Sequence, residues 1–548
     1  MGQGAQFRSW SRQSSAGQRG ALAAAAVLVL GLAGWALVPT STGKATLTGA
    51  AGGGAPIAAA PSPGTDGSTP SAVSPSSPAA VGGPAGVLPA PGLASTGSGV
   101  TAGGGAPVGP PAVGPSGAAS SLGAAPRPPG ATTAAPSCGR LTATDTGVTP
   151  TEIHLAVVTL DLEGAIGNSA VGLASEAQQE QMAQAMADDI NARGGVNCRK
   201  LVLTFYKGNP IDPTQAQQAC LDIVSGSFFA VIDLGGLSNP PGVGDCVPQH
   251  KIPYFASNGL TPGEQKQYSP YIMSMSFNTV AMQRNAILAM NARGFFSPAN
   301  GFKKLGIFMD DCSAEVNQAT FDALASIGIA KSQISVAEYA CPSGGFPAPS
   351  VAEAAVLQHV RDGVTNVIPV DGGGGFKEYT TAAQNQAFKP KYTTTDYAGM
   401  EITATGATGP LPTNFDGTVS VSISKIGENT SGLTDATTQH CIDVFKRHGL
   451  SADLVFPSRS DQYPAGGSLC TTFETVARAI AKDPGLKRVG ISTGLASLGH
   501  VPMAYLLADA DFDRPGKVTG GDYYWVVQFS AACTCWHVID KTPHPLLS

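Results

Sequence analysis

The residues of this chain that could bind a small molecule lie in short polar loops, each of which follows an apolar stretch predicted to be a β-strand. In an open α/β sheet, ligands bind beyond the carboxyl ends of the strands, because loops and helix N-termini present free N–H groups there. The loops that this rule selects are 161–169, 235–239, 257–261, 310–313, 371–376 and 396–399. Their hydroxyl, amide, carboxylate and backbone groups could together hold a small polar ligand.

The elements that must position the first three loops alternate between strand and helix. Strands are predicted over 152–160, 201–206, 229–234 and 252–257, with an extended stretch over 271–277 and a short helix over 244–250. One amphipathic helix ends at Gly194, and another begins with Asp212 as N-cap and Pro213 at its first position and stops at Gly226. Because parallel strands need a crossover between them, this order predicts a parallel sheet.

The same alternation starts again after residue 304. Strands are predicted over 305–309, 334–339, 366–370 and 392–395, and helices over 314–326, 351–361 and 376–386. Two consecutive runs of strand and helix indicate two sheets, and therefore an α/β protein with two lobes.

The amino-acid sequence of the first strand–helix alternation resembles that of a known family. Residues 191–200 read N-A-R-G-G-V-N-C-R-K, and Asp212-Pro213 begins the next helix. This pattern is similar to the type I solute-binding proteins of ABC transporters, the branched-chain amino-acid-binding kind, with Cys198 where a glycine is usual. The resemblance covers about 148–540 and is strongest in its first 110 residues.

The resemblance implies two Rossmann-like lobes, the type I periplasmic binding protein fold, joined by a hinge of three crossovers. The crossovers are expected near 276–279, near 418–424 and around 498–515. The expected lobes are 138–278 with 424–505, and 279–423 with 506–548.

The resemblance also implies a binding site between the lobes, in which first-lobe hydroxyls and amides hold a carboxylate and a second-lobe acid holds an amine. Phe376 resembles a lid residue after a glycine run, and Asp396 stands where the amine-binding acid tends to occur. Glu163 departs from the family pattern, which leaves room for an amide, a polyol or a cationic or aromatic molecule. The candidate ligand-binding residues are Glu163, Ser238, Ser257, Asn258, Gly259, Asp311, Gly373, Phe376, Asp396 and Tyr397.

Each candidate has a structural alternative. Ser238 could cap the following helix, and Asn258-Gly259 could supply a turn with positive φ. Phe376 could be the first core residue of its helix, and Asp396 could be an N-cap. Asp310-Asp311 resembles a metal pair but also a helix cap beside a surface charge.

The N-terminal part indicates export. Arg8, Arg12 and Arg19 precede an uncharged apolar run over 21–38, so residues 1–44 are a signal peptide or a signal anchor. Residues 45–137 carry only two charges and no aromatic, and we expect a disordered Ala/Gly/Pro/Ser-rich tether. The positive-inside rule places the folded part outside the cytoplasm, either secreted or anchored to the cell membrane.

All ten cysteines follow the tether, and their even number in an exported chain predicts disulfides. Pairing of sequence neighbours is the simplest scheme, for example Cys220 with Cys246. Cys533 and Cys535 are expected to be poor partners, because alternate residues of a strand point to opposite faces. No C-x-x-C pair supports a zinc site.

Motifs and charge favour binding over other functions. The net charge is −6 and no basic patch follows the tether, so nothing supports nucleic-acid binding. No G-x-S-x-G, G-x-x-x-x-G-K-[ST] or H-E-x-x-H motif occurs. The sequence therefore predicts a monomeric solute-binding protein, without cofactor, that captures an amino acid or amide-like ligand for an ABC permease. A ligand-sensing receptor domain of the same fold and an extracellular enzyme stay open as alternatives.

Overall fold

The computed structural model describes residues 138–162, 168, 174–209, 212–234, 242–340, 347–372, 374–400, 411–425, 435–455, 465–513 and 516–546. All of them belong to one compact unit, Ala112–Ser548. The apolar run 21–38 and the predicted tether lie outside the described residues. Within the described ranges, no helix is long and apolar enough to cross a membrane.

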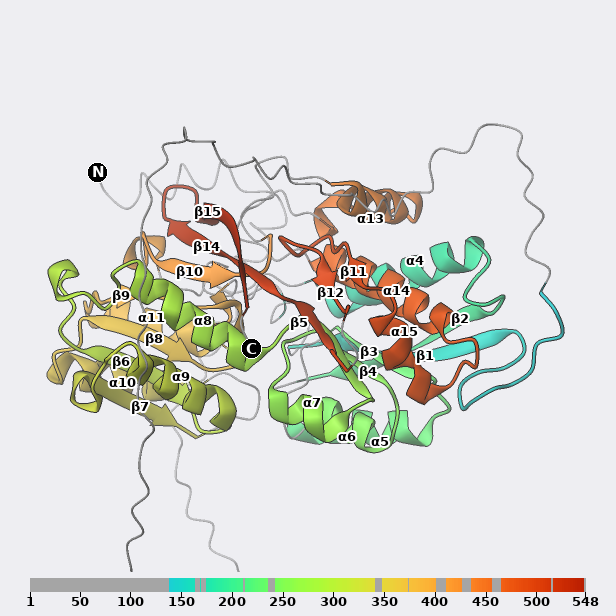
Figure 1. Ribbon diagram of the computed structural model, residues 1–548, viewed down its shortest axis with the longest axis horizontal. Coiled ribbons are helices and arrows are strands. Elements are labelled where there is room, and N and C mark those ends of the chain that lie inside the picture. The colour runs from blue at the N-terminus through green and yellow to red at the C-terminus, as the bar shows by residue number, and fades with distance from the viewer. Residues whose placement is uncertain are drawn as a thin grey trace, which may run out of the picture. The chain divides into compact units, whose positions relative to one another are not determined.

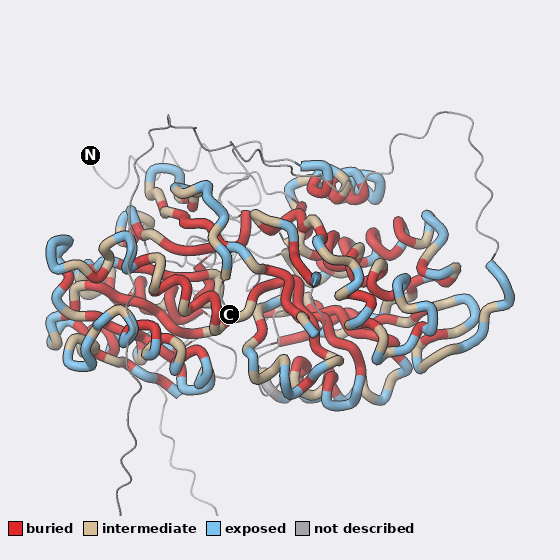
Figure 2. The backbone as a smooth tube through the Cα atoms, viewed as in Figure 1, coloured by how far each residue is buried: buried red, intermediate tan, exposed pale blue. Residues whose placement is uncertain are grey.

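The first sheet is parallel and has six strands in the order β13-β5-β4-β3-β1-β2 (Figure 1). Its strands are β1 (Glu152–Leu160), β2 (Lys200–Gly208), β3 (Ala230–Asp233), β4 (Tyr254–Ala256), β5 (Ile272–Phe277) and β13 (Thr519–Gly521). Every residue of β3, β4 and β5 is buried, as expected for strands covered on both faces (Figure 2). The predicted parallel sheet is confirmed.

Local signals set the ends of the helices that accompany this sheet. They are α4 (Glu176–Ala192), α5 (Pro213–Ser225), α6 (Val243–Gln249) and α7 (Pro262–Tyr268). Asp212 caps α5 by accepting hydrogen bonds from the N–H groups of Thr214 and Gln215, and Gly226 ends the helix, as predicted. After α4, Gly194 takes a positive φ of 107° that favours glycine.

The second sheet is also parallel and has the order β7-β6-β8-β9. Its strands are β6 (Leu305–Asp310), β7 (Ile334–Tyr339), β8 (Asn366–Val370) and β9 (Lys391–Tyr392), and its helices are α9 (Ala314–Ser326), α10 (Pro349–Arg361) and α11 (Gly375–Asn385). Neighbouring residues of β6 face opposite sides, so Ile307 joins one hydrophobic core and Phe308 the other. The predicted second run of strands and helices is confirmed.

An antiparallel sheet of β10, β14 and β15 continues the second sheet beyond β9. These strands are β10 (Val419–Ser422), β14 (Tyr523–Ser530) and β15 (Cys535–Pro545). The Thr393 hydroxyl donates to the carbonyl of Val419 at 2.8 Å, and the Ser420 hydroxyl donates to the carbonyl of Thr394 at 2.5 Å. Side-chain hydrogen bonds therefore join β10 to the segment that follows β9.

The remaining elements connect the sheets or cover the first one. They are α8 (Thr279–Ala292), α13 (Ala436–Arg447), α14 (Ala465–Lys482), α15 (Ile491–Ala496), β11 (His500–Val501) and β12 (Ala510–Asp511). Short 3-10 helices occupy Pro298–Asn300, Lys331–Gln333, Asp396–Ala398, Pro412–Asn414, Ala452–Leu454 and Arg488–Gly490. α13 and α14 pack against α4, which assigns them to the first sheet.

The chain passes between the sheets at three places, and one of them corrects the prediction. α8 leaves the first sheet after β5, and residues 423–425 lead from β10 toward α13. The third passage lies at Asp522, between β13 and β14, and not within 498–515, because β13 pairs with β5. The placement of 519–521 in the second lobe was therefore wrong. A three-residue Thr-Gly-Gly strand carries no apolar pattern from which it could be predicted.

The disulfides follow the nearest-neighbour scheme. The described pairs are Cys138–Cys198, Cys220–Cys246, Cys441–Cys470 and Cys533–Cys535. Cys312 is also disulfide-bonded, and Cys341 lies outside the described residues. The expectation that Cys533 and Cys535 are poor partners was wrong. Cys533 and Thr534 lie in the turn before β15, and Thr534 has a φ of +52°, so strand alternation does not apply there.

Candidate ligand-binding site

The carboxyl end of the second sheet gathers two aspartates that brace its loops. The Asp310 carboxylate accepts hydrogen bonds from the N–H groups of Ser313 at 2.8 Å and Gly372 at 3.2 Å. Asp371 is fully buried and accepts a hydrogen bond from the Tyr339 hydroxyl at 2.9 Å. Burial, followed by the charge of Asp371, raises the pKa of Tyr339, so this hydroxyl remains a hydrogen-bond donor. Asp310 thus takes the capping role, and neighbouring Asp311, a predicted site residue, is exposed.

Tyr397 joins this group of loops. Its hydroxyl donates a hydrogen bond to Ser313 Oγ at 2.6 Å, and Ser313 is the residue directly before α9. Burial raises the pKa of Tyr397, and the charge of Asp310 adds to this effect. The structure therefore brings two predicted regions, 310–313 and 396–399, into direct contact.

Asp396 lies next to Tyr397 but turns its carboxylate to the connection between the sheets. Its two oxygens accept hydrogen bonds from the Ser422 hydroxyl at 2.8 and 3.1 Å and from the Ile423 N–H at 2.6 Å. Burial raises the pKa of Asp396 to about 6, although these hydrogen bonds act in the opposite direction. The predicted amine-binding acid thus anchors the start of the segment 423–425.

That segment is part of the hinge. The N–H of Lys425 donates to the carbonyl of Tyr505 at 2.7 Å, and the N–H of Leu507 donates to the carbonyl of Ile423 at 2.8 Å. The connecting segment 423–425 therefore runs antiparallel to residues 505–507, which stay with the first sheet. Asp396, which follows β9 of the second sheet, binds the segment 423–425.

Phe376 lies in the core and not at the surface of the cleft. Its side chain has zero exposure, and its ring packs edge-on against Tyr392 with centroids 5.9 Å apart. A lid must reach the ligand from the cleft surface, and this side chain does not do so in the observed conformation. The alternative of a first core residue in the helix is the one that the structure supports.

The candidates after β4 lie in a tightly packed turn. Ser257 Oγ donates to Asp233 at 3.4 Å, and the carbonyl of Asn258 accepts from the Ser274 hydroxyl at 2.6 Å. A Cβ at Gly259 would lie 2.8 Å from the carbonyl oxygen of Phe277, so glycine is required here by close packing and not by a positive φ. The side chain of Asn258 is exposed. Glu163, Ser238 and Gly373 lie outside the described residues.

One contact between the sheets was not predicted. The N–H of Gly263, in the first turn of α7, donates to Oε2 of Glu315 in the first turn of α9 at 3.0 Å. α7 follows β4 of the first sheet, and α9 follows β6 of the second. Thr261 and Glu264 form a capping box at α7, and this T-x-x-E pattern could have predicted the helix from the sequence.

The region around this contact is acidic. Burial, together with the nearby charges of Asp245 and Glu315, raises the pKa of Glu264, although its bonds to Thr261 lower it. The charge of Glu264 also contributes to the raised pKa of Tyr397, which lies on the side of the second sheet.

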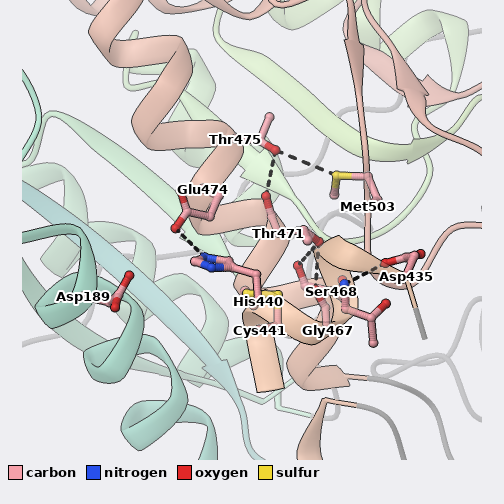
Figure 3. The surroundings of a disulfide bond; sticks show 12 residues. Asp189, Asp435, His440, Cys441, Gly467, Ser468, Thr471, Glu474, Thr475 and Met503 are labelled. Carbon is pink, nitrogen blue, oxygen red and sulfur yellow. Dashed lines mark hydrogen bonds and ion pairs between the residues drawn. A yellow bond between two sulfur atoms is a disulfide. The ribbon is translucent and has the colours of Figure 1, made fainter. Parts of the chain in front are cut away.

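Two groups of described residues have the composition of a metal site, and basic side chains accompany both. Asp189, His440 and Glu474 lie near the Cys441–Cys470 disulfide (Figure 3). Arg193 bonds both carboxylates of this group, and Arg447 also bonds Asp189. Since these ion pairs balance the carboxylates, the group serves to join α4, α13 and α14.

The second group lies beside β11 and β12. It contains His500, Asp511 and Asp513, and Lys517 Nζ lies 3.6 Å from Asp511. Lys517 also forms an ion pair with Asp522. The Lys517 ammonium therefore balances the negative charge of Asp511, as a metal cation would.

Comparison with known proteins agrees with this architecture. A family model described as periplasmic binding protein matches residues 166–423. No curated protein sequence matches the chain.

Solved structures resemble it over most of its length. A fatty acid ABC transporter substrate-binding protein from Thermomonospora curvata has a TM-score of 0.52 and 16% identity, covering 74% of this chain and 95% of its own. A possible leucine/isoleucine/valine-binding protein from Rhodopirellula baltica has a TM-score of 0.51 and 15% identity, covering 73% and 98%. A solute-binding protein from R. palustris in complex with 4-hydroxybenzoate has a TM-score of 0.52 and 13% identity, covering 72% and 97%.

The fold and the matched family define the class of the protein. The chain has the type I periplasmic binding protein fold, as its sequence resemblance predicted, and the family that matches it consists of binding proteins. At 13–16% identity, the solved structures establish the fold and leave the ligand open.

Proposed function

We propose that this protein captures a small polar molecule between its two sheets and delivers it to an ABC permease outside the cytoplasm. The observation that carries the proposal is the hydrogen bond between Gly263 and Glu315. It joins the first turns of α7 and α9, two helices that follow strands of different sheets, at the edge where open α/β sheets bind ligands. Closure of two lobes about a hinge brings such loops together around a ligand.

The lobes of the proposal follow the sheets. The first comprises 138–278 and 424–521, and the second comprises 279–423 and the chain after Asp522. Residues 423–425 lead from one lobe to the other, pair with 505–507 of the first lobe and form part of the moving connection. Asp396 fixes the second-lobe end of this hinge, which explains why its carboxylate is bonded to backbone.

Three predicted residues, Tyr397, Asp311 and Asn258, are proposed to meet the ligand, which we take to be an amino acid or an amide-like molecule. Tyr397 offers a hydroxyl whose raised pKa keeps its proton, and Asp311 and Asn258 present exposed polar groups from the two sides. One similar structure is named a fatty acid ABC transporter substrate-binding protein, and another is a complex with 4-hydroxybenzoate, so aromatic and carboxylate-bearing molecules belong in the test.

A thermal-shift panel of amino acids, amides, aromatic acids and sugars tests the proposal. A ligand at one hundred times its Kd stabilises the folded state by about 2.7 kcal/mol, which corresponds to roughly 3 °C for a folded part of this size. Y397F should weaken the shift, and Y392F, which alters a tyrosine in the core, should leave it. If no compound shifts melting, capture of a small molecule is wrong.

Delivery is tested separately from capture. Uptake of the identified compound by cells should depend on this protein and on a membrane permease. Binding without any effect on uptake would instead favour a sensor, and chemical change of the compound would favour an enzyme.

A further inference from the structure

The disulfide Cys533–Cys535 differs from the other described cross-links in the loop that it closes. It joins residues two apart, whereas the other described bridges span 26, 29 and 60 residues. It lies at the turn between β14 and β15, where Ser530 pairs with Cys535. A cross-link of this length restricts only its own turn, so opening it leaves the rest of the fold connected.

The backbone between the two cysteines is held in an unfavourable conformation. Thr534 has a φ of +52°, in the left-handed region that β-branched residues rarely adopt. Cys198 also has a positive φ, of 63°, but its turn is closed by two backbone hydrogen bonds between Val196 and Arg199 at 2.8 and 3.0 Å. Opening Cys138–Cys198 therefore leaves that conformation in place, whereas the positive φ at Thr534 lies between the two bridged cysteines themselves.

One sulfur of the short bridge is within reach of a reagent. Cys533 is exposed and Cys535 is buried. By contrast, the sulfurs of Cys441–Cys470 belong to fully buried residues, and Cys220 is almost fully buried. Since exchange begins with attack of a thiolate on one sulfur, access favours Cys533 over these buried cysteines. Cys138 is exposed as well, so the two accessible bridges differ in the loop that they close and in their turns.

The surroundings of the turn keep their packing without the bridge. Trp536, directly after Cys535, is fully buried and packs edge-on against Phe529 with centroids 5.4 Å apart. Phe529 stacks on Phe415 at 4.2 Å. On the other side of the turn, the N–H of Ala531 donates to the Asp416 carboxylate at 2.7 Å. Aromatic packing and this hydrogen bond thus hold β14 and β15 together in either redox state.

We propose that Cys533–Cys535 is a thiol–disulfide exchange site that accepts two electrons from small thiol molecules, separately from the ligand cleft. A thiolate attacks Cys533 Sγ, the bond between the two sulfurs breaks, and Cys535 leaves as a thiolate that takes up a proton. A second thiolate attacks the small-molecule sulfur of the mixed disulfide, so the oxidised small molecule forms and Cys533 leaves as a thiolate that takes up a proton. Two thiols are oxidised to one disulfide, and one protein disulfide is reduced to two thiols. Short, exposed and strained bridges have the higher reduction potentials that such exchange requires.

The test incubates the full chain with graded mixtures of reduced and oxidised glutathione, alkylates the free thiols, and maps them by mass spectrometry. Cys533 and Cys535 should become alkylated at a ratio of reduced to oxidised glutathione at least tenfold lower than Cys220 and Cys246 need. In C535S, glutathione should be found attached to Cys533. Earlier opening of Cys138–Cys198, or simultaneous opening of all bridges, would overturn the proposal.

A matched variant tests the backbone argument. T534G removes the cost of the left-handed conformation, so the bridge should become harder to reduce by about tenfold. T542G changes a threonine of β15 outside the turn and should leave the ratio at its wild-type value. An unchanged ratio in T534G would contradict the proposal, because it would show that opening the bridge relieves no strain.

Discussion

Two loops of the second sheet use an aspartate after a strand, and they use it for different purposes. Asp371, after β8, binds the Tyr339 hydroxyl within its own lobe. Asp396, after β9, binds the Ser422 hydroxyl and the Ile423 N–H at the connection to the first sheet. The first joins the ends of β7 and β8 within the second sheet, and the second fixes the connection between the two sheets. The position of an aspartate after a strand therefore predicts which end of the sheet it occupies. Its role becomes clear only from the groups that it hydrogen-bonds.

The largest effect on the free energy of unfolding is expected from removing the buried carboxylate of Asp371. D371A removes a buried acceptor and leaves the buried Tyr339 hydroxyl without it, so the free energy of unfolding should fall by about 3 kcal/mol. D371N retains an oxygen acceptor and should cost less. Urea denaturation measures both, with E353A on the exposed side of α10 as a control that stays within about 0.5 kcal/mol of wild type. Equal loss in D371A and E353A would contradict a stabilising role of the buried Asp371 carboxylate.

Asp396 should make the free energy of unfolding depend on pH. The pKa of Asp396 is raised from 3.8 to about 6 in the folded state, so the folded protein binds this proton more tightly than the unfolded chain. The resulting stability is present below pH 4 and is lost as the pH rises through 6. Relative to D396N, which does not titrate, wild type should lose on the order of 2 kcal/mol between pH 4 and pH 7. Urea denaturation at both values measures this, and a pH-independent difference would show that Asp396 is not buried at the hinge.

A smaller loss of stability is expected when the hydrogen bond between Tyr397 and Ser313 is removed. Y397F removes the hydrogen bond to Ser313 Oγ and should cost about 1 kcal/mol of stability. S313A removes the same bond from the other side, so the double variant should cost less than the sum of the two single variants. Additive costs would mean that the two side chains do not interact.

The smallest effect on stability is expected for changes to the hydrogen bond between Gly263 of α7 and Glu315 of α9. E315Q keeps an acceptor but removes the charge at an exposed site, so its cost should stay below about 0.5 kcal/mol. G263A should displace the flexible Glu315 carboxylate, because a Cβ at Gly263 would lie 1.9 Å from Glu315 Oε1. Both variants should alter ligand affinity more than melting temperature. Affinity equal to wild type in both would contradict a role of this contact in closure.

Much of the fold could be predicted because local signals mark it. The ends of β1, β7, β8 and α9 coincide with the predicted residues. Continuous apolar runs and cap residues defined these elements without information from elsewhere in the chain. β13 and α13 were missed, because a three-residue edge strand and a helix held by a disulfide and ion pairs depend on distant partners.

The site was predictable as a region but not as a set of roles. The rule of strand ends selected the loops that contain Asp310, Ser313 and Tyr397, and the structure joins them. The direction of a side chain at a strand end depends on what packs beside it, which explains the unexpected roles of Phe376 and Asp396. Gly263 and Glu315 meet only through the arrangement of two sheets.

Amide hydrogen exchange tests the central claim most directly. A compound identified by melting shift should slow exchange in 260–268 and in 311–317, because closure buries loops of both sheets and strengthens the bond from the Gly263 N–H to Glu315. The core strand β8 serves as an internal reference that should not change. Protection of loops on one sheet alone, with the compound bound, would contradict capture by closure of two lobes.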